Sequence, residues 1–160
     1  QELAAGRSEA DVVGAPAAAR ERPGGKRTTF SLRETGAQYT LDEVVEETGA
    51  DPKLVIELEE WGIVAAAVID GVRHYDDTDR EIVRAVRELA AYGVAGRNLR
   101  VFKTSAEREA ALLQQILAPA LRSRNPERRK EAIEALENLA AVASHLKHLL
   151  LVRDLRRIAK

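Results

Sequence analysis

Few residues in this sequence have the types and spacing that catalysis or metal binding requires. The 160 residues include no cysteine, which excludes thiolate catalysis, disulfides and cysteine-ligated zinc. His145 and His148 lie three apart, as two metal ligands on one helix face would, but the nearest acid, Asp154, is six residues further on. No glycine-rich phosphate loop and no Gly-x-Ser-x-Gly motif occurs. We therefore expect no catalytic residue, no metal and no cofactor, and a protein that is not an enzyme.

Acidic residues are concentrated in one part of the chain. Residues 39–79 contain twelve acidic groups and only two basic ones, Lys53 and Arg73, for a net charge of −10. Residues 80–160 contain seventeen basic and nine acidic groups, although the whole chain has a net charge of only −1. A segment of net charge −10 repels the phosphates of duplex DNA. Acids that are adjacent in sequence on short helices are normally both in water, so they are poor candidates for general acid–base catalysis.

Four aromatic residues fall at the ends of the predicted elements. They have two interpretations, a small apolar core or the lining of an effector pocket, and the core is the simpler one because the chain has only six aromatics. These residues are Trp61, Tyr75, Tyr92 and Phe102.

Two short helices are predicted to begin this acidic segment. Thr40 and Glu43 have the spacing of a capping box, so a helix begins here, and Gly49 ends it. Asp51 and Pro52 are an N-cap and a first helical residue, and the helix that they start ends at Trp61-Gly62. Two short helices joined by a tight glycine turn form a helix-turn-helix.

A hairpin and further helices are predicted to follow. Residues 63–69 are rich in β-branched side chains, Asp70-Gly71 favours a two-residue turn, and Val72–Tyr75 is the return strand. We expect Tyr75 to point toward the third helix, at Asp77–Tyr92, and Arg73 to face the acidic pair Asp76–Asp77 from a solvated strand.

Two capping signals divide the rest of the chain into helices. We expect a short helix at Arg97–Lys103 and a second capping box at Thr104–Glu107 that begins another helix. Asn125-Pro126 starts a helix that contains neither Gly nor Pro up to Ile158, a length of ~50 Å. Its leucines have heptad-like spacing, which favours a homodimer, although packing inside a helical domain would use the same stripe. These leucines are Leu136, Leu139, Leu146 and Leu150.

The N-terminal segment has a different composition. Residues 1–38 are rich in Gly, Ala and Pro without apolar periodicity, which predicts a disordered linker. The sequence contains no Met, even at position 1, so we expect a piece of a longer chain. No stretch resembles a signal peptide or a membrane span, which favours a cytoplasmic protein without membrane contact.

The order of helix, glycine turn, helix, hairpin wing and helix resembles the MerR family of bacterial transcription regulators. Tyr39-Thr40-Leu41 is similar to the opening of that family, and the run from Gly71 to Tyr75 is similar to its wing motif Gly-x-Arg-x-Tyr, followed by the acidic Asp79. The resemblance implies a mainly α fold with a winged helix-turn-helix at 39–103 and a helical region at 104–160.

The recognition helix departs from the MerR pattern. Where the family has an arginine and aromatics, this sequence has Ile56, Glu57 and Leu58. Only Lys53 and Arg73 remain as weak candidates for DNA contact. Because cation–phosphate pairs precede base readout, we expect this module to have lost DNA binding.

Later motifs are similar to the C-terminal domain of actinobacterial MerR-type regulators of the FtsR kind, which are linked to a cell-division gene. They run from Arg97 to Thr104, from Ala106 to Glu109, and over Arg124-Asn125-Pro126-Glu127. The resemblance implies a regulatory or oligomerisation domain, with DNA bound by a separate N-terminal domain. Two alternatives stay open: a small-molecule effector sensor, or direct DNA binding through the wing and the basic C-terminal half.

Overall fold

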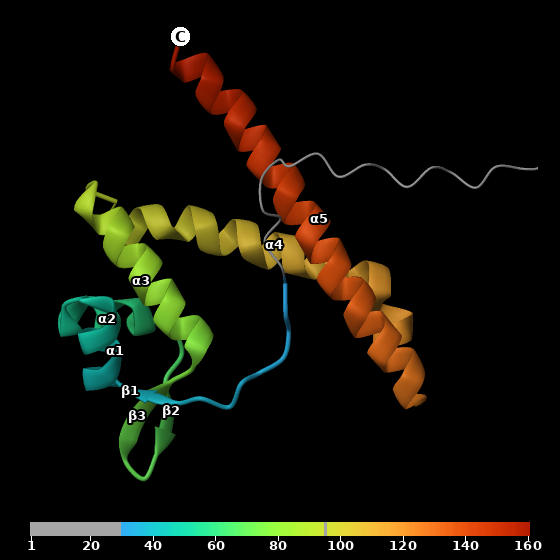
Figure 1. Cartoon of the computed structure of the whole chain (residues 1–160), viewed down its shortest axis with the longest axis horizontal. Helices are drawn as coiled ribbons and strands as arrows, with labels where there is room; N and C mark the ends of the chain where they lie inside the picture. Colours follow the sequence, from blue (N-terminus) through green and yellow to red (C-terminus); the bar gives the residue numbers. More distant parts are fainter. Residues whose placement is uncertain (1–29, 95) are drawn as a thin grey trace, which may run out of the picture.

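The computed structural model describes residues 30–94 and 96–160, and it is mainly helical with one small antiparallel sheet (Figure 1). The predicted fold class is therefore confirmed. Of the expected linker, residues 1–29 lie outside the described residues, and residues 30–38 contain no helix or strand. The elements are β1 (Tyr39–Thr40), α1 (Leu41–Thr48), α2 (Pro52–Glu60), β2 (Ala67–Ile69), β3 (Val72–Tyr75), α3 (Asp77–Ala91), α4 (Gly96–Leu121) and α5 (Pro126–Ile158).

The helix-turn-helix is capped as the sequence predicts. The Thr40 hydroxyl oxygen accepts the backbone N–H of Glu43 at 3.3 Å. Gly49 ends α1 in the left-handed conformation, with φ at 72°. The Asp51 carboxylate accepts the backbone N–H of Lys53 at 2.8 Å, and Pro52 is the first residue of α2. Each cap satisfies a backbone group that a helix end leaves unpaired.

The sheet contains a strand that the sequence did not reveal. Its order is β1-β3-β2, with Tyr39 opposite Tyr75 and Thr40 opposite His74. A strand of two residues is too short to show a period of two, and its partner lies about 35 positions further along the chain, so local patterns do not predict the pair. β1 holds the segment before α1 against the wing.

The wing turn has the predicted backbone conformation. Asp70 and Gly71 have φ values of 51° and 77°. Positive φ at both central residues is what a two-residue hairpin turn of type I′ requires. The partners of β2 and β3 run from Ala67 opposite His74 to Ile69 opposite Val72, so the turn closes the hairpin directly.

Gly71→Val is expected to lower the free energy of unfolding by about 1 kcal/mol or more, because a β-branched residue resists positive φ. No atom lies within 4 Å of a Cβ added there, so the loss would come from the backbone alone. Arg73→Ala, the control on the same wing, should cost less than ~0.5 kcal/mol because the side chain is half exposed. Thermal melts of both variants measure the difference, and equal losses would contradict a turn-specific effect.

The core lies between the helix-turn-helix, the wing and α3. Val44, Val55, Leu58, Tyr75 and Val83 are all fully buried. Tyr75 and Val83 belong to the same cluster, as predicted for the side of the wing that faces α3. Among the buried residues of this cluster, one comes from beyond α3, Leu99 of α4. The start of α4 is therefore anchored in the core of the first half.

A single helix replaces the two that were expected between residues 97 and 121. α4 runs unbroken from Gly96 to Leu121, so the prediction that a capping box at Thr104–Glu107 begins a new helix is wrong. Extending a helix costs less than starting a new one, and no Gly or Pro lies between Arg97 and Thr104 to stop it. Pro119 lies inside α4, which ends two residues later. The division expected between residues 103 and 104 falls within this helix.

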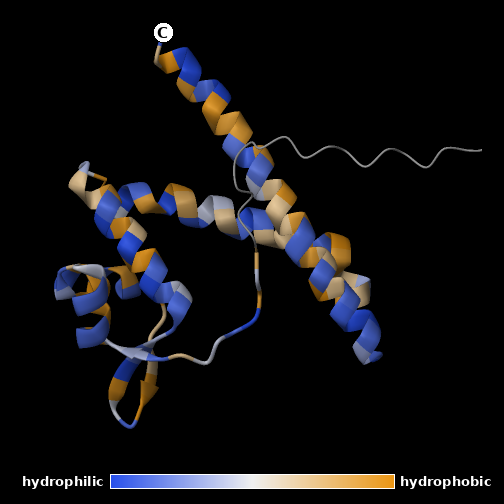
Figure 2. Ribbon diagram, viewed as in Figure 1, coloured by the Kyte–Doolittle hydropathy of each residue, from blue (hydrophilic) through white to orange (hydrophobic). Residues whose placement is uncertain are grey.

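Helix α5 has the predicted length and packs on α4 before projecting past it (Figure 1). Ala132, near its start, is buried against α4. Further along, Lys147 donates to Ser105 at 2.7 Å and to Glu109 at 3.1 Å, which marks where the two helices cross. From His148 to Ile158 the helix extends beyond this crossing, and Figure 2 shows apolar residues along it. No helix of the described chain is long and apolar enough to cross a bilayer.

Candidate functional site

The outward face of α2, which is the recognition helix in a helix-turn-helix, is acidic. Glu57 is exposed, Ile56 is half-buried, and Leu58 is fully buried in the core. Of the three residues that depart from the MerR pattern, only Ile56 and Glu57 therefore face outward. Glu60 is also exposed, and the single cation of α2, Lys53, lies at its first turn. The face that would meet DNA offers almost no positive charge to a phosphate.

The two weak candidates for DNA contact, Lys53 and Arg73, are not brought together. The Arg73 guanidinium lies 3.6 Å from the Glu59 carboxylate, at the opposite end of α2 from Lys53. Six helical positions separate Lys53 from Glu59, or about 9 Å along the axis. The expectation that Arg73 faces Asp76–Asp77 is wrong, because the hairpin twist brings it to α2 instead. Arg73 thus balances an acid of its own module.

Glu59 also accepts a hydrogen bond from Tyr75. The Tyr75 hydroxyl donates to Glu59 Oε2 at 3.1 Å. Burial, together with the negative charge of Glu59, raises the pKa of Tyr75 to about 12. The phenol therefore stays protonated near neutral pH and holds the wing to the end of α2. This contact is structural, because Tyr75 is completely buried.

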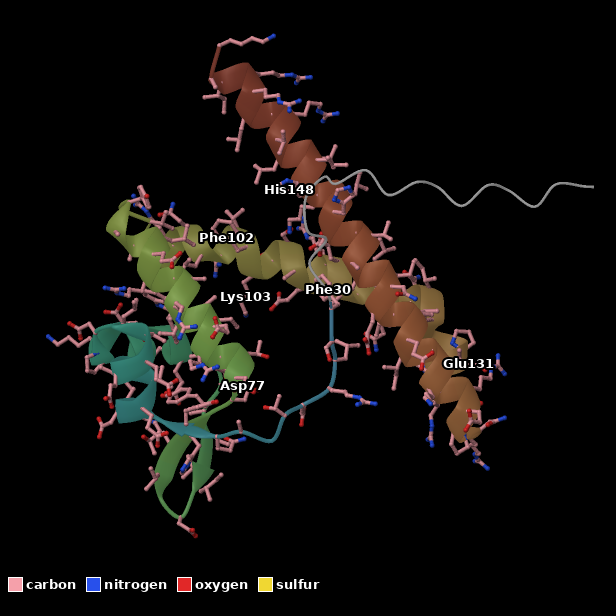
Figure 3. The ribbon with its side chains drawn as sticks, viewed as in Figure 1. Phe30, Asp77, Phe102, Lys103, Glu131 and His148 are labelled. Carbon is pink, nitrogen blue, oxygen red and sulfur yellow. The ribbon has the colours of Figure 1, made fainter. Side chains whose placement is uncertain are left out.

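A polar cluster fixes the segment before β1 to the start of α3. Asp77 accepts hydrogen bonds from the hydroxyls of Thr35 and Tyr39, the latter at 2.8 Å (Figure 3). These two hydrogen bonds lower the pKa of Asp77, and the bond from Thr35 contributes the most. The Arg80 guanidinium lies 4.5 Å from the centre of the Tyr39 ring and pairs with Glu47 at 3.0 Å. The chain therefore enters this module along a defined path from Thr35 onward.

The structure does not gather the four aromatic candidates into one pocket. Tyr75 is in the core, and Tyr92 caps the end of α3 with 90% of its surface exposed. Phe102 is more than half exposed on α4. Trp61, at the end of α2, is the one of the four that lines the cavity described in the next paragraph. The core interpretation thus fits Tyr75, whereas Trp61 lines a cavity.

A cavity of about 780 Å³ lies between the end of α2 and the first turns of α4. Trp61 and Ile63 form one wall, and the backbone of Gly96 approaches the indole so closely that an added Cβ would overlap the ring. Three cations of α4 face the same space, with Lys103 projecting toward the helix-turn-helix (Figure 3). The cavity is lined by Glu60, Trp61, Ile63, Gly96, Arg97, Arg100, Lys103, Thr104 and Glu107.

Sequence reasoning missed the cations of this cavity. Arg97 and Arg100 stand three apart on one helix, and the spacing was a usable signal for a shared face. Their relation to Trp61 was not predictable, because 36 residues separate Trp61 from Arg97 and the contact depends on how α4 leaves α3. Gly96 allows a close approach to the backbone, but the sequence does not show which side chain makes it.

The leucines proposed for dimerisation divide into two pairs. Leu136 and Leu139 are half-buried beside α4, whereas Leu146 and Leu150 are 56% and 41% exposed. The structure thus places the first pair where α5 packs within the chain and leaves the second pair open. Other exposed apolar residues surround the second pair on the projecting part of α5: Leu149, Leu151, Leu155 and Ile158.

The remaining charged candidates form no described site. His145 and His148 are exposed on α5, and no group of three or more possible metal ligands occurs among residues 30–94 and 96–160. Near the start of α5, Arg129 and Lys130 line a shallow hollow with Leu32 and Arg33 of the segment before β1. Glu134 and Glu137 share that hollow, so its charge is mixed.

Comparison with known proteins places these features in context. The model of the Rv1828-like C-terminal domain family matches residues 37–159. Two relatives are the uncharacterized HTH-type transcriptional regulators Mb1859 of Mycobacterium bovis and Rv1828 of Mycobacterium tuberculosis. Each is 27% identical to this chain over 115 residues, which are 72% of this chain and 45% of the relative. The chain thus spans less than half the length of the relatives that it matches.

Proposed function

Because the chain belongs to the Rv1828-like C-terminal domain family, we propose that it is the regulatory and oligomerisation domain of a DNA-binding transcription regulator. Its matched relatives are uncharacterized HTH-type transcriptional regulators. In this proposal a separate N-terminal domain binds the promoter, and the present chain joins two subunits into a homodimer. The proposal depends above all on one observation, the apolar part of α5 that projects past α4 without a partner in the described chain.

The exposed part of α5 supports the oligomerisation role. Leu146, Leu149 and Leu150 lie on one side of α5, and each exposes two fifths or more of its surface. Residues 148–158 extend about 16 Å past the crossing with α4. Exposed apolar surface on a projecting helix commonly marks a protein interface. A second copy of the same helix would bury these residues in a two-fold symmetric contact.

The acidic face of α2 supports the loss of DNA binding. With Glu57 and Glu60 exposed and Arg73 paired to Glu59, the module resembles a MerR winged helix-turn-helix in form only. In this proposal the winged helix-turn-helix has become a structural module that supports α4 and α5. The finer relationship, to MerR regulators of the FtsR kind that act in the cytoplasm, is part of the same proposal. Which promoter is controlled would follow from the N-terminal domain.

The chain by itself is expected not to bind duplex DNA with sequence specificity. A titration of labelled DNA from upstream of its own gene, at about 150 mM salt, should show no saturation below ~10 µM protein. Lys53→Gln and Arg73→Gln should leave this result unchanged. Specific binding in the micromolar range, lost in Arg73→Gln, would instead support the alternative of direct DNA contact through the wing.

A further inference from the structure

We infer that the cavity between α2 and α4 binds a small organic anion that carries an aromatic or other flat apolar ring. Trp61 and Ile63 provide the surface for the ring, and Arg97 and Arg100 provide the charge for its carboxylate or phosphate. The binding itself does not depend on the proposed function. Its consequence, that the domain senses a metabolite, rests on that function.

The apolar wall of the cavity has the form of a stacking surface. Trp61 is the C-cap residue of α2 and keeps 43% of its surface exposed, which is unusual for the one tryptophan of a small domain. Gly96 supports the ring from the side of α4, because any side chain at this position would overlap the indole. The indole is thus held at the mouth of the cavity and is not covered by the protein. A flat ligand would cover it.

Two of the three cations that line the cavity have no acidic partner among the described residues. Arg97 and Arg100 make no ion pair or hydrogen bond with the residues that the structure describes. Lys103 forms an ion pair with Glu107 at 3.1 Å, and the side chain of Glu107 is more than half exposed. The guanidinium group binds carboxylate and phosphate oxygens in a fixed, two-pronged geometry. Two unpaired arginines beside an exposed indole therefore match a ligand with a ring at one end and an anion at the other.

Size and charge favour a small ligand over a nucleic acid. The volume of about 780 Å³ is within the range of small-molecule sites. Glu60 and Glu107 stand at the same cavity, and the adjoining residues 39–79 have a net charge of −10. A polyanion would meet these acids as it extended from the site, whereas a mono- or dianion would not. The cavity thus favours a ligand that carries one or two negative charges and a single ring.

Trp61 gives a direct readout because it is the only tryptophan. We would record the single indole N–H signal in ¹H–¹⁵N spectra of the 160-residue chain while adding phenyl phosphate. The signal is expected to shift in a saturable manner. Inorganic phosphate, which lacks the ring, and benzyl alcohol, which lacks the charge, should each bind at least 10-fold more weakly. Benzoate in a parallel titration distinguishes a carboxylate ligand from a phosphate ligand.

A double variant and a matched control test the location. Arg97→Gln with Arg100→Gln should weaken phenyl phosphate binding at least 10-fold. Arg122→Gln with Arg124→Gln removes the same number of charges just after the far end of α4, outside this cavity, so it should leave the affinity within about twofold. The spectrum of each variant reports whether the domain is folded.

Four results would overturn the inference. They are the absence of saturation by either aromatic anion at 10 mM, equal binding of inorganic phosphate, equal binding of benzyl alcohol, and equal weakening by the double variant at Arg122 and Arg124, which would indicate diffuse attraction to the basic part of the chain. Failure of the proposed function would be seen separately. A chain that binds phenyl phosphate but sediments as a monomer would retain the anion site and lose the oligomerisation role.

Discussion

Leu146→Glu is expected to weaken self-association of the chain by about 100-fold or more. Leu146 is 56% exposed at the point where α5 leaves α4, and Leu150 lies one turn further on. In a two-fold symmetric dimer the substitution occurs on both subunits, and each copy would bury an unpaired carboxylate among apolar side chains. Changes at the centre of an interface commonly cost 2 kcal/mol or more. Sedimentation velocity over a range from about 1 to 100 µM would measure the dissociation constant.

The matched control for this prediction is His148→Glu. Residue 148 is about 200° around the helix from residue 146, so it lies on the other side of α5. It is also exposed, so the substitution adds a charge at a comparable position without entering the expected contact. The control should dimerise like the original chain. A chain that is monomeric without any substitution would refute the dimer, and equal dissociation by both variants would refute this face as the interface.

Leu58→Ala is expected to lower the free energy of unfolding by about 2–5 kcal/mol. Leu58 has no exposed surface and packs among residues of α1, the wing and α3. Its carbonyl oxygen also accepts the backbone N–H of Ile63 at 2.8 Å, so the backbone around it is held in place and cannot easily close a cavity. Urea denaturation followed by far-ultraviolet circular dichroism would measure the loss.

Ile56→Ala is the control for Leu58→Ala, since it removes an aliphatic side chain from the same helix where the side chain is only half-buried. We expect a loss of about 1 kcal/mol or less there. A similar loss in both variants would mean that the outward face of α2 is covered by a partner or by another part of the chain. In that case it would be wrong to describe the outward face of α2 as free of contacts.

Local capping chemistry made much of the fold predictable. The helix starts at Thr40, Asp51 and Asn125 were readable because each cap satisfies backbone groups within three residues of itself. The Asp70-Gly71 turn was readable for the same reason, since its conformation depends on those two residues. The same rule failed at Thr104, where a sequence with good capping residues lies inside a helix that begins upstream at Gly96.

The features that the sequence did not reveal depend on contacts between distant residues. β1 exists because Tyr39 meets Tyr75, and the path into it is fixed by Asp77. The cavity exists because α4 leaves α3 at an angle that brings Arg97 to Trp61. Neither relation has a local sequence signal. The exposed state of Leu146 was likewise set by where α4 and α5 cross, and the heptad-like spacing alone did not distinguish it from the half-buried Leu139.

Because α4 is unbroken, a small movement at one of its ends displaces the other end by a larger distance. One end is fixed in the first core through Leu99, beside the cavity, and α5 is held further along α4 by the Lys147 contacts and by the packing near Ala132. A straight helix of this length measures about 39 Å, so a tilt of about 5° at Gly96 would displace its far end by roughly 3 Å. Two such arms joined through α5 would change the spacing of whatever is attached to each subunit. In the proposed homodimer, a small rotation near Trp61 would therefore change the distance between the parts that the two subunits carry.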